Sequence, residues 1–158
     1  MKVSRIYDAE TLNERINEPD ILVNAAPGYV SYDLSEFVYD IRNIVLSHSR
    51  SMAIFQYLGE GVYQGHYMNP SDYRGRDARE SSKMMLSEMF TNYPVDAIYG
   101  RISRNHRAAR VMTRSLGFTM IGKCRDAEGQ SCVEYLMERD EWEKFLASDE
   151  ARRTPTTR

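Results

Sequence analysis

Hydrophobic residues in the first half of the chain alternate with polar ones in a pattern typical of β-strands. Three stretches with strand character follow one another, at Asn43 to Leu46, Met52 to Tyr57 and Gly61 to Met68. The breaks between them, at residues 47–50 and 59–61, are short enough for antiparallel hairpins. The pattern therefore predicts a β-meander in the middle of the chain.

The next segment changes to the spacing of a helix. A helix is predicted from Asp77 to Thr91, and its small and apolar positions share one face, as expected for a helix that lies on a sheet: Ala78, Ser82, Met85, Leu86 and Met89. Pro94 ends this helical region, and Ala97 to Ile102 is predicted as a strand. A strand–helix–strand crossover makes that strand parallel to the one that ends at Met68.

A second helix is predicted after Asn105 and ends at Gly117, a residue that suits a left-handed helix terminus. Its predicted inward face holds four residues: Ala108, Val111, Met112 and Leu116. Residues 119–125 and 131–138 are predicted to form a closing hairpin. Asp140 is predicted to cap a last helix, whose inward side chains are Trp142, Phe145 and Leu146.

The first 40 residues carry weaker signals. Val3 to Tyr7 is predicted as a short strand, and Asp8 as the N-cap of a helix that buries Leu12 and Ile16 and ends at Pro19. Residues 20–40 are predicted to be irregular or short-helical. Their four aromatic residues form either a wall of a substrate pocket or packing under a long loop: Tyr29, Tyr32, Phe37 and Tyr39.

These elements predict a single α/β domain with a mixed, mostly antiparallel sheet and helices on both faces. A chain of 158 residues is long enough to bury one sizeable core. We expect the domain to span residues 1–148 and a disordered tail to span residues 149–158. No apolar run approaches the roughly 20 residues of a membrane span. The N-terminus lacks the apolar region of a signal peptide, so we expect a cytosolic setting.

Two cysteines, Cys124 and Cys132, flank the predicted turn of the closing hairpin. A tight turn would place their thiols on opposite sides of the sheet, whereas a loop one residue longer would place them opposite each other. For a cytosolic protein we expect both cysteines to be reduced and unpaired.

Positive charge is concentrated in the middle of a chain whose net charge is −2. Between Arg74 and Arg114 there are nine basic residues and four acidic ones. A basic middle in an acidic protein indicates a local polyanion site more than a surface that attracts nucleic acid as a whole.

The segment from Ser71 to Glu80 combines a strand end, a glycine-bearing loop and a helix start. Free backbone N–H groups and the helix dipole favour an anion there, and Arg74 and Arg76 add positive charge. Gly75 allows the backbone to approach a ligand closely. The segment therefore predicts a phosphate-bearing ligand. The alternative interpretation is that Asp77 is an ordinary N-cap and the arginines are solvated.

The order of elements and two motifs resemble the GCN5-related N-acetyltransferase (GNAT) superfamily from Val3 to Glu138. The motifs are Tyr73-Arg74-Gly75-Arg76-Asp77-Ala78 and Asn105-His106-Arg107-Ala108-Ala109, the latter continuing to Gly117-Phe118. Within the superfamily the chain most resembles small GNAT-like proteins of bacteriophages. The resemblance implies acetyl-CoA as cofactor, an amine-bearing acceptor, and a cofactor site made of Tyr67, Met68, Arg74, Gly75, Arg76, Asp77, Ala78, Arg79, Asn105, Arg107 and Ala108.

Three residues are candidates for acid–base catalysis. His66 is the candidate general base, since imidazole titrates near neutral pH, and the alternative is a half-buried structural histidine. Glu60 could act as a base through a water, or be one more exposed acid in a hairpin turn. Tyr135 could protonate the leaving thiolate, or be a packing residue. The histidine spacing resembles no metal site, so no metal is expected.

Three functions remain open. The first is an N-acetyltransferase that transfers an acetyl group from acetyl-CoA to an amine of a small molecule or a protein. The second is a GNAT-like binding or structural protein without turnover, for example in a phage particle. Asp77 favours this second function, as does Met112 or Thr113 where the family often has a tyrosine. The third is a nucleic-acid binder that uses an arginine stripe from Arg101 to Arg114. We expect no membrane partner and leave a homodimer open.

Overall fold

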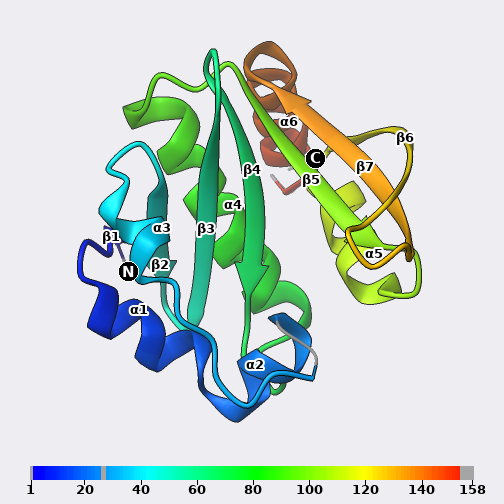
Figure 1. Cartoon of the computed structure of the whole chain (residues 1–158). Helices are drawn as coiled ribbons and strands as arrows, with labels where there is room; N and C mark the ends of the chain where they lie inside the picture. Colours follow the sequence, from blue (N-terminus) through cyan, green and yellow to red (C-terminus); the bar gives the residue numbers. More distant parts are fainter. Residues whose placement is uncertain (1, 26–27, 154–158) are drawn as a thin grey trace.

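Within residues 2–25 and 28–153, which the computed structural model describes, seven strands form one sheet in the order β1-β2-β3-β4-β5-β7-β6 (Figure 1). The strands are β1 (Ser4–Arg5), β2 (Ile44–His48), β3 (Ser51–Gly59), β4 (Val62–Met68), β5 (Ala97–Ser103), β6 (Thr119–Arg125) and β7 (Ser131–Glu138). β4 and β5 run parallel, and the other neighbours run antiparallel. The predicted meander, parallel crossover and closing hairpin are confirmed.

Six helices in the described part of the chain lie on the two faces of this sheet (Figure 1). They are α1 (Ala9–Ile16), α2 (Pro19–Ala25), α3 (Ser35–Tyr39), α4 (Gly75–Asn92), α5 (Arg107–Ser115) and α6 (Arg139–Arg153). The first three cover one face, and α4, α5 and α6 lie behind the other. This arrangement confirms the predicted fold class. No helix among the described residues is long and apolar enough to cross a membrane.

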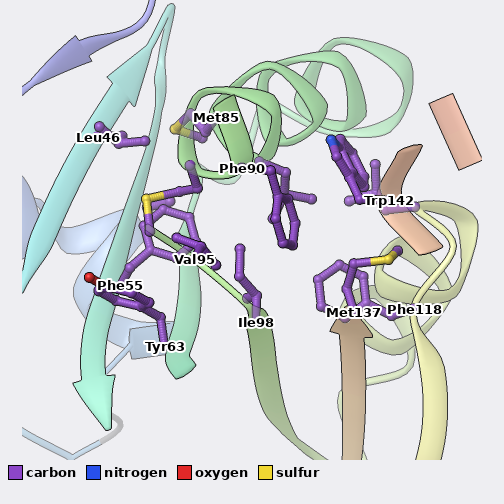
Figure 2. Close-up of a cluster of buried hydrophobic side chains, with 14 of the residues drawn as sticks. Leu46, Phe55, Tyr63, Met85, Phe90, Val95, Ile98, Phe118, Met137 and Trp142 are labelled. Carbon is purple, nitrogen blue, oxygen red and sulfur yellow. The ribbon is translucent and has the colours of Figure 1, made fainter. Parts of the chain in front are cut away.

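Each face of the sheet has its own hydrophobic cluster. The larger cluster lies under α4 and includes Phe55 and Tyr63 from one half of the sheet and Ile98 and Met137 from the other (Figure 2). The smaller cluster lies under α1 and α2 and joins residues of both helices to Val45, Met52 and Met68. All five residues predicted for the inward face of α4 are buried.

The N-terminal elements are shorter than predicted. β1 contains two residues instead of the predicted five. Asp8 caps α1 as predicted, because its side chain accepts a hydrogen bond of 2.8 Å from the Thr11 backbone N–H. Pro19 does not close α1, which ends at Ile16. It opens α2 instead, because proline is well suited to the first position of a helix, where its missing N–H has no intrahelical role.

Two later helices also differ from prediction. α4 begins two residues before Asp77. In α5, Ala108 and Val111 are exposed, whereas Thr113 and Leu116 are buried. The predicted inward face of α5 was therefore partly wrong. Gly117 ends the helix with φ = +87°, as predicted, and the closeness of the Phe145 ring leaves no room for a side chain there.

The closing hairpin pairs Cys124 with Cys132, and a disulfide joins them. The prediction of two reduced, unpaired cysteines is therefore corrected. The physical reason is the strand register. The five-residue loop from Asp126 to Gln130 places the two cysteines directly opposite each other, on the same face of the sheet, with their Cα atoms 4.9 Å apart.

The helix α6 extends beyond the boundary predicted at residue 148. Asp149 is 5% exposed, and its carboxylate accepts hydrogen bonds from Lys83 (2.7 Å) and Arg79 (3.1 Å) of α4. Arg153 lies 3.4 Å from the same carboxylate. These contacts hold residues 149–153 against the domain and correct the predicted tail, while residues 154–158 lie outside the described part.

Asp149→Ala should lower the free energy of unfolding by about 1.5–3 kcal/mol at pH 7, because Arg79 and Lys83 lose a charged acceptor. Burial by itself would raise the pKa of Asp149, but the hydrogen bonds from Lys83 and Arg79 outweigh it and lower the pKa from 3.8 to about 2. The stabilisation is therefore complete above about pH 4 and is lost as the pH falls toward 2. Urea denaturation of variant and wild type at pH 7 and pH 3 measures both effects.

The control is Glu143→Ala, which removes an exposed carboxylate from the same helix that has no ion pair with the described residues. Equal destabilisation by the two substitutions, or a difference that does not shrink at pH 3, would contradict this role of Asp149.

Candidate functional site

The central strands β4 and β5 are paired over three rows and then separate. Val62, Tyr63 and Gln64 pair with Ala97, Ile98 and Tyr99, and no pairing continues beyond them. Beyond these rows the two strands diverge (Figure 1), and we use the word opening for the unpaired edges of residues 65–68 and 100–103 that face each other there. Their backbone groups on this side have no backbone partner among the described residues. The opening therefore offers hydrogen-bonding groups to a ligand.

At the closed end of this strand pair, one backbone carbonyl accepts two further hydrogen bonds. The Gly61 oxygen accepts hydrogen bonds from the backbone N–H groups of Asp96 (2.8 Å) and Ala97 (3.3 Å). Because β4 and β5 are parallel, the helices that follow them both begin at the other, open end. The predicted sites near Arg74 and Asn105 are therefore brought to the same end of the sheet.

The helix α4 begins at this open end without a side-chain cap. Its N-cap residue is Arg74, and no side chain accepts a hydrogen bond from the first turn. Gly75 has φ = +66°, and no atom lies within 4 Å of the position that a Cβ would occupy. The first N–H groups of a helix have no intrahelical acceptor, so this helix start presents free donors to the solvent.

The charged residues of the predicted phosphate loop have different surroundings. Arg74 is exposed, and its Nε donates to the Ser71 carbonyl at 3.0 Å. Arg76 is exposed and makes no hydrogen bond or ion pair with the described residues. Asp77 lies in the first turn, is exposed, and does not cap the helix with its carboxylate. Arg79 instead contacts Asp149 and the Ser115 carbonyl, so its guanidinium is already engaged.

The start of α5 differs, since it has a cap of its own. The His106 Nδ1 accepts a hydrogen bond from the Ala109 N–H at 3.3 Å. Asn105 lies in the turn before the helix, and Arg107 and Ala108 are exposed in its first turn. These residues lie at the open end, but the helix start without a side-chain cap is that of α4.

His66 lies on β4 two residues before its end, on the face of the sheet opposite α4. The alternation along the strand places Tyr63 in the cluster under α4, and Met68 in the cluster under α1 and α2. The His66 side chain reaches solvent, but the surrounding protein partly desolvates the ring and lowers the pKa of the imidazole below its ordinary 6.5. The imidazole is therefore neutral at pH 7 and can accept a proton.

The other two predicted catalytic residues are not placed beside His66. Glu60 lies in the turn at the closed end of β4, six residues or about 20 Å along the strand. Tyr135 is 1% exposed in the cluster under α4, where it pairs with Gly100 at the start of the opening. Glu60 is thus separated from the opening, and Tyr135 is buried beside it.

Two residues predicted to contact a cofactor, Tyr67 and Met68, end β4 at the opening. The Met68 side chain is buried under α1 and α2, so it is the backbone of this residue that borders the opening. The Tyr67 hydroxyl is buried without a hydrogen-bond partner among the described residues. Burial raises the pKa of this phenol.

One polar cluster near the opening was not predicted from the sequence. On the face that carries His66, the Tyr99 hydroxyl donates to Glu134, and the Arg101 Nε lies 3.4 Å from the same hydroxyl. Burial and the Glu134 contact raise the pKa of Tyr99. The alternation along β5 indicates that Tyr99 and Arg101 share a face, but their contact with Glu134 depends on the β5–β7 register, which the sequence alone does not define.

The predicted arginine stripe does not form one surface. Arg101 points to the face opposite the cluster that contains Ile98, whereas α5 packs Leu116 into that cluster. Arg101 and the arginines of α5 therefore lie on different sides of the sheet. The Arg110 Nε is moreover buried, without a partner among the described residues.

The sequence matches no protein-family model and no curated protein, but its fold matches solved structures. A variant of spermidine N-acetyltransferase SpeG from Vibrio cholerae matches with a TM-score of 0.71 at 13% identity, over 94% of this chain and 99% of that chain. A GNAT-family acetyltransferase from Bacillus anthracis matches with a TM-score of 0.62 at 17% identity, over 89% and 96%. The ribosomal-protein-S5-alanine acetyltransferase of Vibrio fischeri matches with a TM-score of 0.65 at 12% identity, over 89% and 93%. The chain therefore has the fold of GNAT acetyltransferases.

The pKa of His66 should lie below 6.5 in the folded protein, as measured by NMR titration of the imidazole carbon-bound protons, with His66→Gln to assign the signal. Since the unfolded chain binds this proton more readily, protonation of His66 also lowers stability as the pH falls below 6.5. A pKa at or above 6.5 would contradict the desolvation of the ring.

Proposed function

We propose that this protein is an N-acetyltransferase that uses acetyl-CoA and acetylates an amine of a small molecule or a protein. The observation that carries the proposal is the opening between β4 and β5 beside the uncapped start of α4. The fold shared with acetyltransferases of three bacteria supports it. Those proteins are named for different acceptors, spermidine in one and a protein alanine in another, so the fold is compatible with either class of amine.

The residues at the opening fit an acyl-CoA. A diphosphate needs several N–H donors and positive charge, and the start of α4 supplies free donors together with Arg74 and Arg76. The space above Gly75 is open, and so is the space above Gly100 at the start of the opening. The unpaired edges of β4 and β5 suit the amide groups of an extended pantetheine arm. Arg79 would act indirectly, because Asp149 and Ser115 hold its side chain.

When bound, acetyl-CoA supplies an acetyl group activated as a thioester. His66 accepts a proton from the acceptor amine at its unprotonated ring nitrogen, and its lowered pKa keeps the ring neutral at pH 7. Tyr67 and Met68 border the opening beside it and orient the acyl end through their backbone groups. Glu60 is too far along the strand to share this role directly.

The test is calorimetric titration of the folded protein with acetyl-CoA and, separately, with CoA. We expect micromolar binding with one-to-one stoichiometry. The double variant Arg74→Ala with Arg76→Ala should weaken CoA binding by about 1.5–3 kcal/mol for each arginine that contacts a phosphate oxygen. Asp77→Asn should strengthen it, because removal of one exposed negative charge relieves a repulsion of about 1 kcal/mol or less.

The matched control is Arg42→Ala, which removes an exposed arginine whose partner is Asp40, away from the opening. Affinity that stays unchanged in the loop double variant would contradict the phosphate site. A folded wild-type protein that does not bind acetyl-CoA would contradict the proposed function and favour a GNAT-fold protein without turnover.

His66→Gln should lower kcat by about 10²–10⁴ at pH 7 while leaving the affinity for acetyl-CoA unchanged, since a general base contributes to the chemical step and not to cofactor binding. In the wild type, the rate should rise with pH through an apparent pKa below 6.5 and then level off. The measurement is the pH dependence of kcat for both proteins. A profile that keeps its shape and height in the variant would exclude His66 from proton transfer.

A further inference from the structure

The loop before α4 is fastened to a distant hairpin turn. The turn between β2 and β3 contains Ser49 and Arg50, and Ser49 has φ = +54°. Side chains of this turn and of its flanking residues contact the loop at two points, where Ser51 bonds to Asn69 and Arg50 to Asp72. A third contact joins His48 to Ser81 of α4, which in turn bonds to Tyr73 of the loop. The paired residues are 18, 22 and 33 positions apart in sequence, so these are tertiary contacts.

The first element of this brace is a chain of hydrogen bonds. Ser81 is fully buried on the inner face of α4, and its hydroxyl lies 2.8 Å from both the His48 Nδ1 and the Tyr73 hydroxyl. The Tyr73 hydroxyl also lies 3.2 Å from the Asp77 carbonyl in the first turn of α4. The hydroxyl of Tyr73, the residue directly before Arg74, thus connects the loop to α4 and, through Ser81 and His48, to the sheet.

The second element is a two-point ion pair. Arg50 donates to both carboxylate oxygens of Asp72, at 2.9 and 2.7 Å, and its guanidinium lies over the Tyr73 ring at 5.7 Å. A planar guanidinium that bonds a carboxylate at two points fixes orientation as well as distance. Asp72 and Tyr73 are therefore both held, immediately before Arg74 and Gly75.

We propose that Tyr73, Asp72, Arg50 and Ser81 are positioning residues that preorganise the anion site at the start of α4. The proposal rests on the proposed function, because it names the cofactor's diphosphate as the ligand of that site. A loop that must be ordered when a ligand binds reduces the affinity by the cost of ordering it, and the brace removes that cost in advance. In this proposal the four residues act by holding the loop and not by binding the ligand.

The ion pair offers a test in which electrostatics and positioning predict opposite signs. Asp72→Asn removes a negative charge close to the anion site, so charge alone would strengthen CoA binding. Loss of the two-point contact frees the loop and should instead weaken CoA binding about 3- to 10-fold. The matched control is Asp40→Asn, because Arg42 binds Asp40 at two points on the exposed surface in the same way, but not beside the loop. The control should leave the affinity unchanged.

The hydrogen-bond chain offers a second test. Tyr73→Phe removes one hydroxyl and keeps the ring under Arg50, so the protein should fold as before. We expect CoA affinity to fall about 3- to 10-fold and KM for acetyl-CoA to rise, with kcat nearly unchanged, because the brace acts on cofactor binding and not on the proton transfer at His66. The matched control is Tyr57→Phe on β3, which should change neither parameter.

Hydrogen–deuterium exchange without ligand separates failure of this inference from failure of the proposed function. Amides of residues 72–78 should exchange faster in Asp72→Asn and Tyr73→Phe than in wild type, while those of β3 stay unchanged. If the wild type binds CoA and both variants bind it with the same affinity as the wild type, the inference is overturned and the proposed function stands. If the wild type does not bind CoA, the proposed function fails, and the positioning of an acyl-CoA site is overturned with it even where exchange shows that the brace orders the loop.

Discussion

The hydrophobic cluster that both halves of the sheet share beneath α4 and α6 is the interaction on which the rest of the structure depends. β4 and β5 are joined by three rows of backbone pairing, which is little to hold two sheet halves together. One continuous hydrophobic cluster supplies the remainder, because Phe55 and Tyr63 on one side and Ile98 and Met137 on the other are buried in it together with residues of α4 and with Trp142 of α6 (Figure 2). Burial of such side chains stabilises by about 1.5–3 kcal/mol each. The strands can therefore separate at their ends without the domain dividing.

The same packing determines where the free N–H donors and the arginines at the start of α4 lie. α4 begins close to the end where the two halves separate, because β4 leads into it through the short loop of residues 69–74. α4 begins there with free donors and exposed arginines, whereas α5, beside it, begins with a histidine cap. The charge of Asp77 does not occupy the donors of α4. The free donors of the proposed anion site thus follow from the position of one helix and from the absence of a side-chain cap in its first turn.

The sequence predicts this fold largely through the spacing of its hydrophobic residues and through the residues that end helices and strands. The buried face of α4 follows from residues such as Met85 and Met89 at helical spacing, and the end of α5 follows from Gly117. Contacts between segments distant in the chain could not be predicted in this way. The disulfide depends on the length of the closing loop. The burial of Asp149 depends on two cations of α4, and the Tyr99–Glu134 contact depends on the strand register. Two of the catalytic candidates show the same limit, because the pattern places His66 near one end of β4 and Glu60 in the turn before the other end, but does not tell which end opens.

The opening between β4 and β5 connects chemistry that lies on two faces of one sheet. The proposed anion site belongs to the layer of α4, while His66 and the Tyr99–Glu134 pair face the other side. A long ligand bound at the start of α4 must therefore pass between the strand edges to bring its far end to His66. An acyl-CoA has this form, with charge at one end, an extended amide arm in the middle and the reactive group at the other end. A nucleic acid carries its charge along its whole length and has no corresponding narrow segment. The separated strands thus support the proposed acyl-CoA more than a polyanion, although the arginines by themselves would suit both.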